Sequence, residues 1–290
     1  MQPTESSPAE RRAAPKPAGV LSGDRSADPP IAGLVNLQRR DRVLVATLSR
    51  PPVNALDDTL IDALHAALDV AIADAGIAVL HIRSAERVFS AGADLALIRQ
   101  CFETAGGPDA MTEVVRHMQR LYERLEAAPL ATLAEIGAAA LGGGLELALA
   151  CDLRVAALDA TLGLPESSLG LVPGAGGTQR LTRLAGPGVA KRMILGGELV
   201  GGAEAHALGI VQWALPGAEL ADFAQRLAQR LSAMPKEALA ANKRCIAAQT
   251  DPARDGYAEE LAETRALYDH PETRAKVTAF LARSTPRSSA

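Results

Sequence analysis

The chain has 290 residues, enough for one large domain or two modest ones with a sizeable core. Its 30 Lys and Arg residues against 34 Asp and Glu residues give a formal charge of −4, which supplies no overall field to attract nucleic acid or an anionic membrane. Because 48% of the residues are hydrophobic and only 3% are aromatic, the core must be aliphatic, and aromatic platforms for stacking bases are not expected.

Residues 1–32 are rich in Pro, Ala, Ser and charged side chains and show no apolar period. Such a segment buries too little apolar surface to offset the entropy of ordering, so we expect a disordered tail. No continuous apolar stretch follows its charges, so a secretory signal is not expected. Cys101, Cys151 and Cys245 are far apart, with no spacing typical of metal ligands or disulfides. We therefore expect a cytoplasmic protein that holds no metal.

The chain after the tail alternates between strand and helix patterns. A hairpin is predicted from residues 34–37 and 43–48, which are rich in Val and Leu. Apolar residues at helical spacing then predict a helix over residues 56–73, and an apolar run predicts a strand over residues 77–82. The same alternation continues with a helix over 111–125, a strand over 131–136, a helix from the Gly142–Gly144 triplet, a strand over 153–156 and a helix over 178–184. This alternation predicts an α/β protein.

From residue 218 onward the sequence predicts only helices. Three prolines act as helix start signals, and the predicted helices span residues 218–234, 236–249, 253–268 and 272–283. We therefore divide the chain into a tail (1–32), a catalytic core (33–217) and a helical region (218–290). The last two helices carry an apolar stripe that is expected to mediate oligomerisation. Its residues are Leu261, Leu267, Val277, Phe280 and Leu281.

Two glutamates stand in apolar, glycine-rich surroundings. The apolar run over residues 130–151 contains Glu135 and Glu146, so we expect it in the protein interior and not in a membrane. Burial beside leucines on a helix would raise the pKa of Glu146 toward the range useful for proton transfer. Glu166 follows a proline in a similarly apolar loop. From composition alone, each glutamate could equally be a paired or helix-capping acid.

Glycines mark two places where backbone N–H groups can bind an anionic oxygen. The Gly142–Gly144 triplet lies at a predicted strand-to-helix junction, where the helix dipole adds positive potential. Gly92 lets the chain turn after a predicted strand and leaves the amide of Ala93 available. Two such donors from separate loops would make an oxyanion hole. Signatures of serine hydrolases, P-loop nucleotide-binding proteins and zinc proteases do not occur in the sequence.

Five segments, taken in this order, resemble the enoyl-CoA hydratase/isomerase family of the crotonase superfamily over about residues 34–283. They are Arg50–Leu56, Phe89–Leu95, Leu141–Asp152, Gly163–Glu166 and Pro173–Leu181. The resemblance implies a spiral core of ββα turns with a helical C-terminal region for oligomerisation. It also implies a homotrimer or a hexamer built as a dimer of trimers. The implied substrate is an acyl-CoA thioester, so coenzyme A is part of the substrate and no separate cofactor is expected.

The same resemblance assigns roles to particular residues. The two catalytic glutamates fall on Glu146 and Glu166, and the two oxyanion-hole amides fall on Ala93 and Gly143. The remaining implied contacts are to the coenzyme A part of the substrate, with the last one reaching its phosphates from a neighbouring subunit. They are Ala55, Ala91, Asp94, Leu95 and Arg283. The sequence departs from the family pattern at Glu135, which we expect to be a paired structural acid.

The resemblance favours a hydratase that adds water across the C2–C3 double bond of a 2-enoyl-CoA, as in fatty-acid or branched-acyl catabolism. An enoyl-CoA isomerase is the nearest alternative, and it can operate with Glu166 alone, so the presence of Glu146 favours hydration. A non-catalytic acyl-CoA-binding homologue would not need both glutamates. RNA binding is disfavoured because the predicted helix over residues 56–73 has no Lys or Arg and carries several aspartates.

Overall fold

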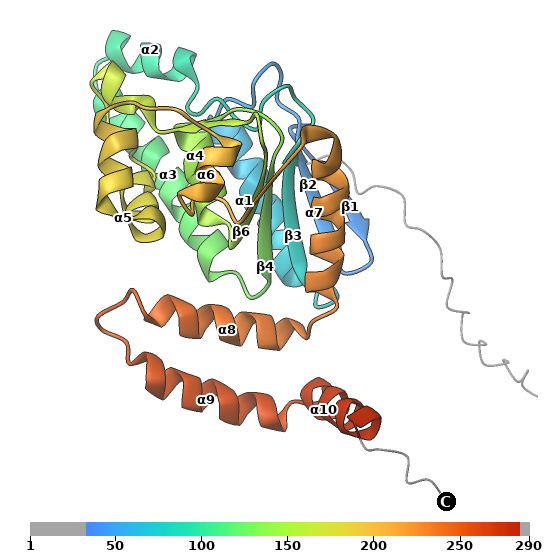
Figure 1. Ribbon diagram of the computed structural model, residues 1–290. Coiled ribbons are helices and arrows are strands. Elements are labelled where there is room, and N and C mark those ends of the chain that lie inside the picture. The colour runs from blue at the N-terminus through green and yellow to red at the C-terminus, as the bar shows by residue number, and fades with distance from the viewer. Residues whose placement is uncertain (1–32, 285–290) are drawn as a thin grey trace, which may run out of the picture.

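The computed structural model describes residues 33–284, so the predicted tail over residues 1–32 lies outside the described part. The larger sheet has the strand order β1-β2-β3-β4-β6-β9 (Figure 1). β1 pairs with β2 in antiparallel fashion, and every other neighbouring pair of this sheet is parallel. Its strands are β1 (Val35–Arg40), β2 (Val43–Leu48), β3 (Val79–Ser84), β4 (Ala131–Ile136), β6 (Leu153–Ala157) and β9 (Trp213–Leu215).

A smaller sheet of short strands connects to the loop that follows β3. β7 (Thr161–Gly163) pairs with β5 (Ala140–Leu141) on one side and with β8 (Val200–Gly201) on the other. Ser90 forms an isolated bridge with Ala140. Segments that follow three different strands are thereby held together at one edge of the body, and this is where the glycine-rich motifs lie.

The helices confirm the expected mixed α/β architecture with a helical C-terminal region. They are α1 (Asp58–Ala73), α2 (Leu95–Glu103), α3 (Gly107–Ala127), α4 (Gly143–Ala150), the 3-10 helix η1 (Pro165–Leu169), α5 (Gly177–Leu195), α6 (Gly202–Ala207), α7 (Gly217–Ser232), α8 (Lys236–Ala248), α9 (Gly256–Asp269) and α10 (Pro271–Ser284). α1 illustrates the local rules, because Asp57 caps it by accepting a hydrogen bond from the Leu60 amide and its apolar stripe is buried. α5 is kinked at Gly186, just before Pro187.

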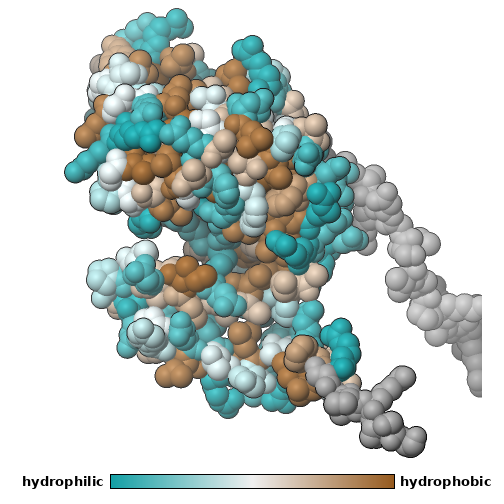
Figure 2. All heavy atoms as spheres, in the orientation of Figure 1, coloured by the Kyte–Doolittle hydropathy of each residue, from teal (hydrophilic) through white to brown (hydrophobic). Residues whose placement is uncertain are grey.

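The C-terminal helices divide between two places in the structure. α7 packs across β2, β3, β4 and β6, so it belongs to the body that contains the sheet. α8, α9 and α10 form a separate layer at one end of that body (Figure 1). Lys243 of α8 joins this layer to the body, because its Nζ lies 2.8 Å from Asp152 Oδ2 and donates to the Leu130 carbonyl at 3.0 Å. Hydrophobic side chains stand on the surface of the layer (Figure 2).

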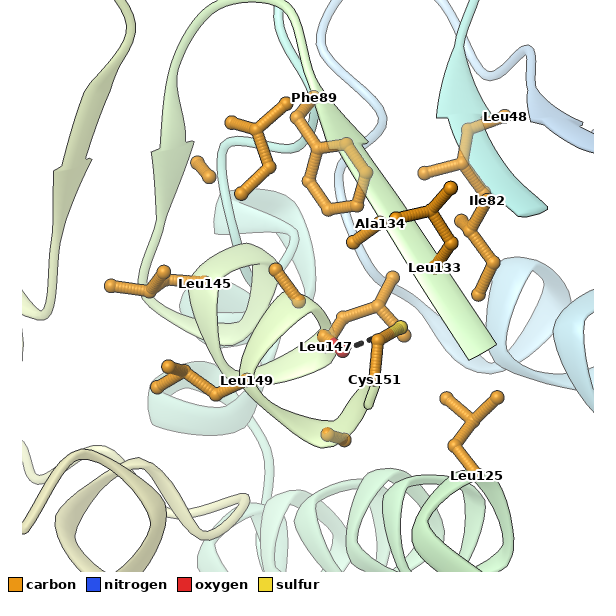
Figure 3. Close-up of a cluster of buried hydrophobic side chains, with 14 of the residues drawn as sticks. Leu48, Ile82, Phe89, Leu125, Leu133, Ala134, Leu145, Leu147, Leu149 and Cys151 are labelled. Atoms are coloured by element: carbon orange, nitrogen blue, oxygen red, sulfur yellow. Dashed lines mark hydrogen bonds between the residues drawn. The ribbon is translucent and has the colours of Figure 1, made fainter. Parts of the chain in front are cut away.

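The core surrounds α4 on every side. All eight residues of this helix are buried, and its leucines pack among side chains that come from the sheet and from α3 (Figure 3). A helix that is apolar all round belongs in a protein interior, which explains why the run over residues 130–151 is so hydrophobic. No helix within residues 33–284 is long and apolar enough to cross a membrane.

Glu135 is a paired structural acid, as expected. It lies on β4 with its Oε2 atom 2.9 Å from Nε2 of His81 on the neighbouring strand β3. Both side chains are almost fully enclosed. Neither Glu135 Oε2 nor His81 Nε2 has a hydrogen-bond partner within residues 33–284, so the pairing is a close contact of two polar groups and not a hydrogen bond.

The approach of α4 to the loop after β3 allows a first test of this packing. A Cβ atom on Gly144 would lie 2.5 Å from the carbonyl oxygen of Ser90 and 2.6 Å from its Cβ. We therefore expect Gly144→Ala to lower the free energy of unfolding by about 2 kcal/mol or more, since rigid backbone must move. Gly188→Ala, on a helix where a Cβ meets nothing within 4 Å, is the control and should change stability by less than ~1 kcal/mol. Urea unfolding measures both, and equal stabilities would contradict this packing.

Candidate active site

The side chain of Glu146 is the buried carboxylate of α4. The residue is 2% exposed, and its Oε1 atom accepts a hydrogen bond of 2.7 Å from the backbone amide of Gly177. Burial raises the pKa of Glu146 to about 7; the Gly177 amide opposes this shift, and repulsion from Glu166 adds to it. The carboxyl group therefore changes its charge near neutral pH, where it can accept or release a proton.

Glu166 comes to the same place from η1, which follows the short strand β7. A Cβ on Gly142, at the start of α4, would lie only 2.8 Å from Glu166 Oε1, so the carboxyl group rests against bare backbone. Its Oε2 atom is buried and has no hydrogen-bond partner within residues 33–284. Burial also raises the pKa of Glu166. The structure thus brings together the two carboxyl groups that the sequence keeps apart.

The amides of Ala93 and Gly143 lie close to each other at the same edge. A Cβ on Gly143 would be 3.8 Å from the Ala93 nitrogen, and one on Gly92 would be 3.3 Å from the Gly143 nitrogen. In the part of the chain that the structure describes, neither amide donates to a protein acceptor. Gly143 begins α4, whose first N–H groups have no partner within the helix. The two amides are therefore available to bind an oxygen atom of a ligand.

A ladder of backbone hydrogen bonds positions the Ala93 amide. The amide of Leu56 donates to the Gly92 carbonyl at 2.8 Å, and the amide of Asp94 donates to the Leu56 carbonyl at 2.9 Å. The amide of Ala91 donates to the Val53 carbonyl at 3.0 Å. The loop after β3 is therefore fastened to the segment before α1 on both sides of Ala93.

Arg50 and Asn54 reinforce this junction, and sequence reasoning gave them no functional role. Arg50 Nη2 donates to Asp57 at 2.8 Å and to Asp94 at 2.7 Å, and this contact lowers the pKa of Asp94. Asn54 is fully buried, and its Nδ2 donates to the Phe89 carbonyl at 3.0 Å. Both residues lie within the segment Arg50–Leu56 that carries the family resemblance, which is the signal that could have drawn attention to them.

Tyr122 on α3 is another residue that sequence reasoning missed. It is fully buried and donates its hydroxyl to the Gly143 carbonyl at 2.8 Å. The bond fixes the peptide unit next to the available amide. Only the helical spacing of neighbouring apolar residues marked this position, and such spacing does not distinguish a core tyrosine from one that supports a site.

The other predicted contact residues lie in two different regions. Three of them flank Ala93 in the chain, namely Ala91, Asp94 and Leu95, and Leu95 is 72% exposed at the start of α2. Ala55 lies in the segment before α1 that is hydrogen-bonded to this loop. Arg283 lies on α10, at the opposite end of the molecule from α2 (Figure 1). Within one chain it does not reach the glutamates, and its Nε donates to the Ala279 carbonyl of its own helix. Its contribution to a neighbouring subunit stays a prediction.

The arrangement combines proton transfer with stabilisation of negative charge. Two carboxyl groups with raised pKa values lie beside two available backbone amides. Such a site can move protons at a carbon next to a carbonyl group while the amides hold the oxygen on which charge develops. Within residues 33–284 no group of three His, Cys, Asp or Glu side chains is placed to hold a metal ion.

Comparisons with known proteins agree with this geometry. The enoyl-CoA hydratase/isomerase family model matches residues 38–287. A probable enoyl-CoA hydratase of Bacillus subtilis (strain 168) is 42% identical over 199 residues, which is 68% of this chain and 76% of the relative. The 2,3-dehydroadipyl-CoA hydratase of Escherichia coli (strain K12) is 35% identical over 252 residues, which is 86% of this chain and 96% of the relative.

Solved structures show the same fold. Pseudomonas aeruginosa DspI has a TM-score of 0.80 at 32% identity, covering 88% of this chain and 96% of its own. The enoyl-CoA hydratase from Bacillus anthracis has a TM-score of 0.79 at 30% identity, covering 87% of this chain and 98% of its own. The crotonase-like fold expected from the sequence is confirmed, and the chain belongs to the enoyl-CoA hydratase/isomerase family.

Proposed function

We propose that this protein is an enoyl-CoA hydratase, which adds water across the C2–C3 double bond of a 2-enoyl-CoA thioester. The observation that carries the proposal is the pairing of the buried carboxyl group of Glu146, which has a pKa of about 7, with the half-buried carboxyl group of Glu166, whose pKa is also raised. Hydration needs both a base for water and an acid for the adjacent carbon. An isomerase that moves one proton along the acyl chain would leave the buried Glu146 unexplained.

In the proposed reaction the thioester oxygen binds to the amides of Ala93 and Gly143. As water attacks C3, electron density moves from the double bond onto this oxygen, and one such amide contributes roughly 3 kcal/mol to the stability of the transition state. Glu146, as the carboxylate, takes a proton from the attacking water, and the hydroxyl group of that water bonds to C3. Glu166, as the acid, gives a proton to C2. Transfer of the proton from Glu146 to Glu166 restores the starting state.

The proposed chemistry moves only water and protons, so it requires no metal or redox cofactor. Coenzyme A enters as part of the substrate. RNA is not proposed as a partner, because Asp58, Asp62 and Asp69 make the surface of α1 acidic. A cytoplasmic location stays a prediction.

The first test replaces each carboxyl group by an amide of the same size. We expect Glu146→Gln and Glu166→Gln each to lower kcat for hydration by at least roughly 100-fold, because proton transfer is lost while the shape is kept. Glu123→Gln, at an exposed position of α3, is the matched control and should keep normal turnover. Short, long and branched 2-enoyl-CoA thioesters are assayed by loss of the enoyl absorbance. Near-normal turnover in either active-site variant would remove that residue from the mechanism.

The raised pKa of Glu146 predicts how activity depends on pH. As the base, Glu146 must be ionised in the free enzyme, so kcat/KM should fall as the pH drops below about 7. This fall of kcat/KM at low pH is the acid limb of the pH profile. If the base were an ordinary exposed glutamate, the acid limb would lie more than two pH units lower. Initial rates between pH 5 and pH 9 measure the limb. A value of kcat/KM that stays constant down to pH 5.5 would contradict the assignment of Glu146 as the base.

We also propose that the chain forms a homotrimer or a dimer of trimers through its C-terminal layer. Ile246, Tyr257 and Leu261 are each more than 70% exposed on α8 and α9. Large apolar side chains in one layer favour contact with another subunit. Such packing would let Arg283 on α10 approach the coenzyme A of a neighbour.

Removal of residues 272–290 tests this assembly. We expect the shortened chain to form a weaker oligomer and to show a higher KM for acyl-CoA, because both the interface and Arg283 are removed. A chain that lacks residues 1–30 is the control and should keep its assembly and its KM. Sedimentation velocity and steady-state kinetics measure both properties. A shortened chain that sediments as a monomer yet keeps its full affinity for acyl-CoA would show that one subunit suffices to build the site.

A further inference from the structure

The carboxylate of Glu146 accepts its backbone hydrogen bonding from one short segment of the chain. This segment, Ala175–Gly177, lies at the start of α5, and its Gly177 amide donates to Glu146 Oε1. The Ala175 amide also favours the charged form of the carboxyl group. Any side chain that fixes this segment therefore fixes the orientation of the proposed base.

Arg180 is the side chain that holds the segment. It lies on the first turn of α5 and is only 7% exposed. Its Nη1 donates to the Ala175 carbonyl at 2.8 Å, and its Nη2 donates to Glu126 Oε2 on α3 at 2.6 Å. Gly176 has a φ of 103°, and a Cβ there would lie 2.3 Å from Nη1. The backbone thus wraps around the guanidinium group.

The guanidinium group also lies over the ring of Tyr122, with its Cζ 5.8 Å from the ring centroid. Tyr122 holds the Gly143 carbonyl through its hydroxyl group. Arg180 therefore contacts a residue that holds the peptide unit next to the Gly143 amide, as well as the segment that binds Glu146. Its Nε atom is buried without a hydrogen-bond partner within residues 33–284, so the side chain holds its neighbours through its two Nη atoms.

The charged groups around Glu146 show how Arg180 affects the ionisation of its carboxyl group. Within residues 33–284, the titratable groups with a marked electrostatic effect on Glu146 include Glu166 from η1 and Arg180 from α5. Tyr122 from α3 interacts electrostatically with Glu146, and Glu126 of α3 is ion-paired with Arg180. Burial raises the pKa of Tyr122 well above its usual value, so this group stays neutral. Glu166 raises the pKa of Glu146 and Arg180 lowers it. Arg180 is thus the group in this set whose positive charge favours the ionised base.

We propose that Arg180 is a positioning residue for Glu146: it holds the Ala175–Gly177 amides against the carboxylate and places a positive charge behind it. The inference rests on the proposed function, because it treats Glu146 as the base. A purely structural arginine would only fasten α5 to α3 through Glu126. The two roles differ in their effect on the ionisation of Glu146.

The test compares neutral and charged replacements of Arg180. In Arg180→Met and Arg180→Gln the positive charge is lost, so the acid limb of kcat/KM should move to higher pH by roughly 0.5 to 1 unit. We expect kcat at pH 7 to fall about tenfold, with a smaller change in KM. Arg180→Lys keeps the charge, but a single ammonium group cannot replace the two Nη atoms that bind the Ala175 carbonyl and Glu126. We therefore expect kcat to fall while the acid limb of kcat/KM stays at the same pH. Arg183→Met, at an exposed position of the same helix, is the control and should change neither quantity.

A direct measurement of the Glu146 pKa separates this inference from the proposed function. Carboxyl ¹³C NMR of the free protein, with Glu146→Gln to identify the signal, requires no turnover. An upward shift of this pKa in the two neutral variants supports the inference even if no 2-enoyl-CoA is hydrated. A Glu146 pKa that does not move in either neutral variant would overturn the inference, whether or not the protein hydrates a 2-enoyl-CoA. If the neutral variants fail to fold, Arg180→Lys decides the positioning role, and unchanged kcat in that variant would overturn it.

Discussion

The burial of the Glu146 carboxyl group within an otherwise apolar helix is the constraint on which the site depends. Every residue of α4 is buried, so water cannot solvate the charge, and the pKa rises to about 7. The same burial that would make an unpaired charge costly gives a carboxyl group whose charge changes near neutral pH. The backbone amides of Gly177 and Ala175 favour the charged carboxyl group without returning its pKa to an ordinary value.

The surrounding backbone follows from this constraint, because a buried site leaves little room for side chains. Gly92, Gly142 and Gly144 allow the loop after β3, the start of α4 and η1 to meet at distances that a Cβ would prevent. The parallel strands bring these segments to one edge of the body, where catalytic groups in α/β proteins commonly lie. The available amides of Ala93 and Gly143 are a consequence of this close approach, and Arg50 and Tyr122 keep them in place.

The long elements could be predicted from the sequence because each has a clear period and a buried face. α1 and β4 illustrate this, since a capping aspartate begins the first and the predicted bounds of the second agree with the structure. α2 was not predicted because none of its residues is buried, and β9 is too short to show a period. The helical pattern from residue 218 was predicted, but the packing of α7 on the sheet was not, because a helix pattern does not specify its partner.

Within the candidate site, the structure brings together the two glutamates and the two amides that the sequence predicted, whereas the groups that hold them were not predicted. The leucines beside Glu146 and the neighbouring glycine triplet made its burial predictable. Its contact with Gly177 depends on tertiary folding, and Arg180 resembles an ordinary surface arginine in sequence until its side chain is seen to fold back over Gly176. Supporting residues leave weak sequence signals because their partners are backbone atoms.

The account claims that the paired carboxyl groups add a hydroxyl group from water to C3 and a proton to C2 of the same acyl chain. The most direct measurement is mass spectrometry and NMR of the product formed from a 2-enoyl-CoA in D₂O enriched in ¹⁸O. The account predicts one ¹⁸O atom in a hydroxyl group on C3 and one deuterium on C2. A product that carries deuterium on C2, has its double bond moved to C3–C4, has lost a proton from C4 and contains no ¹⁸O would contradict it and would show an isomerase instead.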